Sequence, residues 1–93
     1  SQYGYLAAQL RIIRPRIIVA LGGPASSLLL DTKTGITRLR GRVGQWQDPE
    51  SPLQIPVMPT FHPAYILRNY TPEVRQAVWS DMQQVMALLA VKP

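Results

Sequence analysis

His62 is the only histidine in the sequence, and it stands between Phe61 and Pro63 directly after an apolar run. An imidazole at such a position can donate a hydrogen bond to negative charge that builds on a leaving group. The proline after it would fix the direction of the ring. The alternative, and the commoner role of a lone histidine, is a partly buried side chain that hydrogen-bonds locally. With one histidine and no cysteine, the sequence excludes a multi-histidine metal site, a thiolate site, a disulfide and a cysteine nucleophile within this chain.

The segment after His62 carries residues suited to entering a stack of bases. Tyr65, Ile66 and Leu67 form an apolar group, and Arg68 comes directly after them. An exposed apolar wedge can insert between bases while an arginine binds a phosphate. The plainer interpretation is one amphipathic turn that packs on the core. The residue types alone leave both interpretations open.

A glycine turn, Gly22-Gly23-Pro24, follows the first apolar run of the chain. Glycines before a helix let the backbone approach a phosphate closely, so this turn is a candidate for phosphate binding. It has neither the lysine of a Walker A loop nor the spacing of a dinucleotide-binding fingerprint. The alternative is a tight link between a strand and a helix.

Two apolar runs are predicted to be the strands that position these residues. Residues 16–21 (RIIVAL) are rich in β-branched side chains, which is typical of a strand buried on both faces of a parallel sheet. Residues 55–60 (IPVMPT) form the second strand, and their two prolines predict a place at the sheet edge. Loops that follow parallel strands share one edge of the sheet. The glycine turn and residues 61–68 should therefore converge.

Helices are predicted before, between and after the two strands. They cover residues 3–13, residues 25–30, and a long segment that opens with Thr71 as N-cap and Pro72 in the first turn. A helix between two strands indicates parallel pairing with a right-handed crossover. Residues 36–39 are predicted as a short strand in an otherwise irregular stretch over 31–54. The last helix carries an apolar stripe interpreted as core packing: Val74, Val78, Met82, Val85 and Leu89, widened by Trp79 and Met86.

Length and charge define the class of protein and the kind of partner. The 93 residues suffice for one small domain. Ten lysines and arginines against five aspartates and glutamates give a formal net charge of +5, which favours a polyanionic partner. No apolar run approaches the roughly 20 residues of a membrane span, and no secretory signal is visible. We therefore expect no membrane partner and a cytoplasmic location.

Four segments resemble, in order, the C-terminal half of the uracil-DNA glycosylase superfamily, and most closely its family-4 type: RPRIIVALGGPASSLLL, TRLRGR, IPVMPTFHPAYILR and VWSDMQQVM. The specific part is HPAYILR, which resembles that family's second catalytic motif. The resemblance implies a three-layer α/β/α sandwich with a four-stranded parallel sheet and the last strand at its edge. It also implies excision of uracil from DNA by hydrolysis of the N-glycosidic bond, after the base is flipped out of the duplex. Residues 1–93 would be one partial domain of a bacterial or archaeal protein that acts at the nucleoid.

The same resemblance assigns roles to the candidate residues. His62 would hydrogen-bond the uracil O2 and stabilise the charge on the leaving base. The loop that enters the DNA would be Pro63, Ala64, Tyr65, Ile66 and Leu67, with Ile66 or Leu67 filling the vacated space and Arg68 on a phosphate. Gly22, Gly23 and Pro24 would match the family's glycine–serine phosphate loop, although proline and alanine stand here where serine is expected.

Two parts of the family pattern are missing from this chain. The glycine- and acid-containing motif that handles the attacking water belongs to the family's N-terminal half, as do the residues that stack on uracil. We therefore expect that half as a partner, and no activity from this chain alone. Family-4 enzymes hold a 4Fe-4S cluster through four cysteines, the last near the position of Gln2-Tyr3-Gly4, and this chain has no cysteine to bind it.

Two other functions stay open on the sequence. A degenerate relative would bind DNA without chemistry, and a small phospholigand-binding α/β half-domain would use the same two loops for a phosphorylated small molecule. An acidic glycine loop upstream would favour the enzyme, and failure to bind DNA at low salt would favour the phospholigand.

Overall fold

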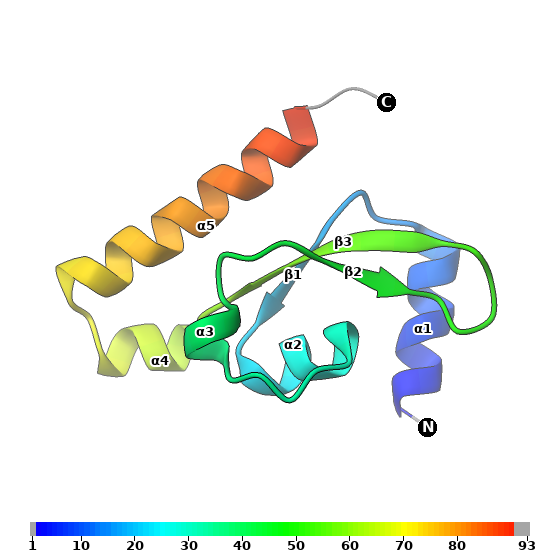
Figure 1. The fold of residues 1–93 in the computed structure, drawn as a ribbon, viewed down its shortest axis with the longest axis horizontal. Helices are drawn as coiled ribbons and strands as arrows, with labels where there is room; N and C mark the ends of the chain where they lie inside the picture. The colour runs from blue at the N-terminus through cyan, green and yellow to red at the C-terminus, as the bar shows by residue number, and fades with distance from the viewer. Residues whose placement is uncertain (1, 91–93) are drawn as a thin grey trace.

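The computed structural model describes residues 2–90, which form an α/β fold of five helices and three strands (Figure 1). None of these helices is long and apolar enough to cross a membrane. The elements in chain order are α1 (Gln2–Ile13), β1 (Ile18–Leu21), α2 (Gly23–Leu30), α3 (Ile36–Leu39), β2 (Gly44–Gln47), β3 (Gln54–Thr60), α4 (Pro63–Arg68) and α5 (Pro72–Ala90).

The sheet has the strand order β1-β3-β2, with β3 in the centre. β1 and β3 are parallel, as predicted, whereas β2 pairs with β3 in the antiparallel direction, so the sheet is mixed. The prediction that the proline-containing strand lies at the edge is wrong. Pro56 lies opposite Gln45 in the β2 ladder only, and Pro59 lies opposite Ala20 in the β1 ladder only. A central strand tolerates both prolines because each of them pairs on one side only, so its missing N–H can face the side that has no ladder partner.

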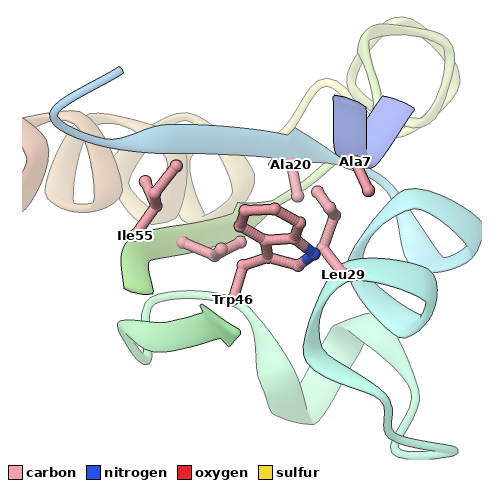
Figure 2. Close-up of a cluster of buried hydrophobic side chains, with 6 residues drawn as sticks. Ala7, Ala20, Leu29, Trp46 and Ile55 are labelled. Atoms are coloured by element: carbon pink, nitrogen blue, oxygen red, sulfur yellow. The ribbon is translucent and has the colours of Figure 1, made fainter. Parts of the chain in front are cut away.

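Helices cover both faces of the sheet, which gives the expected three layers (Figure 1). On one face, α2 packs on all three strands, and α1 joins it through Ala7. Trp46 of β2 is 1% exposed and lies at the centre of this core, between Ala20 and Leu29 (Figure 2). On the other face, α5 packs on β3. Burial of an aromatic side chain of this size is worth roughly 3–5 kcal/mol relative to alanine, so Trp46 is the main apolar anchor of the first layer.

Burial of β1 differs from the prediction of a strand covered on both faces. Ala20 is buried against the α2 layer, but Val19 and Leu21 are 37% and 45% exposed. In the register, Leu21 lies opposite Thr60, whose side chain points to α5. The α5 face of β1 is therefore only partly covered, because α5 lies over β3.

Two short elements between residues 31 and 54 also differ from the sequence prediction. Residues 36–39 form the helical turn α3 instead of a strand, closed by the hydrogen bond from Arg40 N to Ile36 O at 2.9 Å. Gly44–Gln47 is the strand β2, which was predicted to be irregular. Its sequence GQWQ offers one apolar residue, Trp46, and no β-branched residue, so the pattern of a strand is absent.

The long helix begins where the sequence predicts. Thr71 Oγ1 accepts a hydrogen bond from Val74 N–H at 3.2 Å, which satisfies one of the free donors of the first turn. The predicted apolar stripe is buried only in part. Val85 is buried, whereas Trp79 and Met86 are 53% and 51% exposed and Leu89 is 40% exposed, so core packing was the wrong interpretation for these three residues.

A partly buried ion pair joins α1 to the loop between β2 and β3. Arg11 donates two hydrogen bonds to the Asp48 carboxylate, at 2.6 and 2.7 Å. Ser51 Oγ and the Glu50 amide also donate to Asp48, at 2.6 and 3.0 Å. The hydrogen bonds from Arg11, above all, hold the pKa of Asp48 far below its ordinary value of 3.8, against the effect of burial. The carboxylate in turn raises the pKa of Arg11, so both groups stay charged.

Candidate functional site

The two loops that were predicted to converge meet at the carboxyl edge of the sheet, where β1 and β3 both end. Gly22 N–H donates to Thr60 O at 2.8 Å, which joins the end of one strand to the end of the other. A Cβ built on Gly22 would lie 3.1 Å from the Cβ of His62, and Gly22 has φ +91°. Only glycine combines this backbone conformation with so close a neighbour. The glycine turn therefore gives His62 its place beside β1.

The position of His62 at the start of α4 determines which ring nitrogen of the neutral side chain carries the proton. Its Nδ1 accepts a hydrogen bond from Ala64 N–H at 3.0 Å, so the ring serves as the N-cap of the helix. Because Nδ1 is the acceptor, the neutral imidazole carries its proton on Nε2. The side chain is exposed. His62 thus presents an N–H donor that is oriented before any ligand arrives.

The rest of α4 separates into a packed side and an exposed side. Tyr65 stacks on Phe61, with ring centroids 4.5 Å apart, and Phe61 is buried. This contact holds the helix against the end of β3. Leu67 is 81% exposed, and Arg68 beside it is exposed as well. Of the apolar group Tyr65, Ile66 and Leu67, only Leu67 is therefore exposed. The half-buried residues of α4 are Ala64, Tyr65 and Ile66, and Pro63 at its start is exposed.

The other loop leads into the first turn of α2. A Cβ at Gly23 would meet no atom within 4 Å, so the space beside its Cα is open, and Pro24 is exposed. The serine of this turn is not available to a ligand. Ser26 is buried and its hydroxyl donates to Gly22 O at 2.7 Å, which closes the turn from inside.

A buried carboxylate that the sequence analysis missed connects three elements just beneath the carboxyl edge. Asp81 of α5 is fully buried and accepts from Thr60 Oγ1 at 2.6 Å. Arg40, directly after α3, donates two hydrogen bonds to the same carboxylate, and the Asp81 acceptor raises the pKa of Arg40. The signal was present in the sequence, because Asp81 is a charged residue inside the apolar stripe, three positions after Val78 and four before Val85.

The residues present do not fit an iron–sulfur cluster. The chain has no cysteine, and within residues 2–90 no group of three His, Cys, Asp or Glu side chains is placed to hold a metal ion. The segment where the family resemblance places a cysteine opens α1, and Tyr3 there accepts a hydrogen bond from the indole N–H of Trp46 at 3.2 Å. The side chain at this position is a phenol that is hydrogen-bonded to the core, and it is not the thiolate that an iron–sulfur cluster requires.

Comparison with known proteins identifies the class. The model of the family "Uracil DNA glycosylase superfamily" matches residues 1–83, and the chain belongs to that superfamily. Its relatives include a protein named Type-4 uracil-DNA glycosylase from Thermotoga maritima, 40% identical over 86 residues, which are 91% of this chain and 42% of the relative. The protein of the same name from Saccharolobus solfataricus is 34% identical over 96% of this chain and 41% of its own length. The one from Archaeoglobus fulgidus is 34% identical over 95% of this chain and 44% of its own length. The chain thus spans less than half the length of these curated relatives. The family assignment by sequence resemblance is confirmed.

Proposed function

We propose that this chain is the C-terminal half of a uracil-DNA glycosylase domain and that it supplies the electrophilic histidine for excision of uracil from DNA. The observation that carries the proposal is the state of His62: its Nδ1 is bonded to Ala64 N–H, and its Nε2, which has no hydrogen-bond partner among residues 2–90, can donate at the carboxyl edge. That is the edge at which open α/β sheets bind ligands. The names of the relatives supply the substrate.

In the proposed reaction, uracil is flipped out of the duplex and its O2 receives the hydrogen bond from His62 Nε2–H. The bond between the sugar C1′ and uracil N1 breaks, and the bonding electrons leave with the base. His62 stabilises this charge as it develops, without needing to reorient, because Ala64 N–H and Gly22 already hold the ring. Water adds to C1′ and loses a proton, while the departing uracil anion takes up one proton, so the products are the sugar hydroxyl and neutral uracil. The group that directs the water would come from the other half of the domain.

The remaining candidate residues bind and hold the DNA in this proposal. Leu67, or Ile66 beside it, fills the space that the base leaves, and Leu67 is the better candidate because it is 81% exposed. Arg68 contacts a phosphate. Gly22, Gly23 and Pro24 approach a second phosphate through the backbone, since Ser26 is turned into the protein.

The exposed apolar surface on β1 supports a partner that completes the domain. β1 forms one edge of the sheet, and on its α5 face Val19 and Leu21 are exposed. Strands of parallel sheets are normally buried on both faces, so a further α/β segment beside β1 would complete this burial. We propose that this segment is the N-terminal half that the relatives contain, that the chain alone excises no uracil, and that the protein acts on the chromosomal DNA of a bacterium or archaeon.

A chimera tests the proposal. It joins the part of the Thermotoga maritima relative that lies outside the matched segment to this chain. We expect the chimera to release uracil from a labelled duplex, and the chain alone to release no more than a control without protein. Release by the isolated chain would overturn the proposed inactivity. A folded chimera that binds DNA but releases nothing would overturn the enzymatic proposal in favour of a binding protein without chemistry.

A further inference from the structure

The loop between α3 and β2 is fixed against the end of β3, although it is far from His62 in sequence. Gly41 N–H donates to Pro59 O at 3.0 Å, three residues before His62, and Gly41 O accepts from Gln84 Nε2 of α5 at 3.0 Å. Gly41 has φ +78°, and a Cβ there would lie 2.9 Å from the Asp81 carboxylate. We call residues 38–42, which are the last two residues of α3 and the first three of the loop, the arginine loop. Its middle is thus hydrogen-bonded to β3, which ends two residues before His62, and to α5.

Three arginines alternate along this loop, and the structure gives them different tasks. Arg40 turns inward to the buried carboxylate of Asp81. Arg38 and Arg42 on either side of it are exposed. Within residues 2–90, neither of these two has an ion pair or a side-chain hydrogen bond to another residue. The inward arginine anchors the loop, and the two outward arginines carry charge that no acidic side chain of this part of the chain neutralises.

The charge balance of the chain makes this surface suited to a polyanion. Of the five acidic residues, Asp48, Glu50 and Asp81 already pair with Arg11 or Arg40. Guanidinium groups bind phosphate through two parallel hydrogen bonds. A loop that is already held by Pro59 O, Asp81 and Gln84 loses little conformational freedom when a phosphate docks on it.

We propose that Arg38 and Arg42 bind the phosphate backbone of the DNA strand that carries the target base, as a phosphate site separate from both loops of the candidate site. This inference rests on the proposed function and deepens it. A base leaves its stack only if the backbone is held close to it, and phosphate contacts set the position of a protein on DNA. The bond between Gly41 and Pro59 places the arginine loop three residues from His62, at the same carboxyl edge.

The test measures binding of a short uracil-containing duplex by fluorescence anisotropy over a range of salt concentrations. The proteins are the unmodified chain, Arg38→Gln, Arg42→Gln and the control Arg14→Gln. Arg14 is also an exposed arginine, but it precedes β1 and so lies at the other end of the sheet. Each phosphate contact adds about 0.9 to the slope of log affinity against log salt on duplex DNA. We expect Arg38→Gln and Arg42→Gln each to lower the slope by about that amount and Arg14→Gln to leave it unchanged.

A second measurement locates the contact. Single phosphates of the uracil strand are replaced by neutral methylphosphonates. A replaced phosphate near the uracil should weaken binding of the unmodified chain and should have no further effect on the variant that lacks its arginine. If the unmodified chain binds DNA but the slopes of Arg38→Gln and Arg42→Gln equal its own, the inference is overturned while the proposed function stands. An equal fall in Arg14→Gln would show that the slope follows net charge and would also overturn it. No binding by the unmodified chain at low salt would overturn the proposed function, and this inference with it.

Discussion

The two hydrogen-bonding nitrogens of His62 can be separated by substitution, because each nitrogen has a different task. Nδ1 caps α4 through Ala64 N–H, and Nε2 is the proposed donor to uracil. Replacement of His62 by alanine removes both functions. Replacement by asparagine keeps an oxygen that can accept from Ala64 N–H, since asparagine is among the best N-cap residues. It removes the Nε2–H donor, because the asparagine amide ends at the δ position and does not reach the place of Nε2. A comparison of the two variants therefore isolates the chemistry from the fold.

The expected magnitudes follow from these two tasks. Loss of a preorganised donor slows a reaction of this type by about 10²–10³-fold, or roughly 3–4 kcal/mol. Loss of an N-cap lowers stability by about 1 kcal/mol. We expect both variants, made in the chimeric enzyme, to show the fall in rate, and only His62→Ala to lose the stability of the cap. Affinity for a duplex with a noncleavable uracil analogue should change less than about threefold, because ground-state contacts go mainly to phosphates.

The assay is single-turnover excision with enzyme in excess, combined with thermal unfolding of each variant. An excision rate for His62→Asn equal to that of the parent would refute the donor role and return His62 to a purely local hydrogen-bonding role. A loss of affinity as large as the loss of rate would instead identify His62 as a packing or phosphate-binding residue.

Four further predictions concern the rest of the site and the two buried carboxylates that pair with arginines. Leu67→Ala in the chimera should lower excision from an A·U pair by roughly tenfold and from single-stranded DNA much less, because the wedge offsets the cost of unpairing; equal losses on both substrates would speak against a wedge. Arg68→Ala should reduce the salt slope of DNA binding by about 0.9, and an unchanged slope would place Arg68 off the backbone. Asp81→Ala leaves Arg40 unpaired, so we expect this substitution to lower the free energy of unfolding by about 3 kcal/mol and Tm by about 10–25 °C. Removal of the exposed carboxylate of Glu73 on the same helix should lower the free energy of unfolding by less than about 1 kcal/mol. Similar Tm values for the two variants would contradict the anchoring role of Asp81. Because the pKa of Asp48 is lowered in the folded chain, the stability it contributes is present above pH 3.8 and is lost as the pH falls through its lower folded value. The difference in Tm between the parent and Asp48→Asn should therefore shrink steadily below about pH 4, and a constant difference down to pH 2 would show that Asp48 acts through shape rather than charge.

The position of the histidine could be predicted because it depends on topology alone. Two apolar runs joined by a helix form parallel strands, and their following loops meet at one edge. This logic predicts that Gly22 and His62 lie together, and the hydrogen bond from Gly22 N–H to Thr60 O confirms that the two strand ends meet. The orientation of the imidazole could not be predicted in the same way, because it depends on a bond to Ala64 N–H that exists only once α4 has formed.

The errors have a common cause, which is that pairing partners far apart in sequence decided the outcome. Pro56 and Pro59 looked like edge-strand residues, but β2 and β1 end at such positions that each proline enters only one ladder. Asp81 was missed because its partner Arg40 lies 41 positions away in the sequence. Trp46 is the only fully buried residue of β2, so the sequence of that strand has no repeating apolar pattern.

The short length of β1 has a consequence for the behaviour of the chain in solution. An open edge strand with apolar side chains is a template on which further strands can assemble into aggregates. Here that edge is only four residues long, from Ile18 to Leu21. Pro15 and Arg16 precede it and Gly22 turns the chain away after it, and residues of these types resist extension of a strand. An edge of this length offers other copies of the chain too few free backbone groups to stack on it.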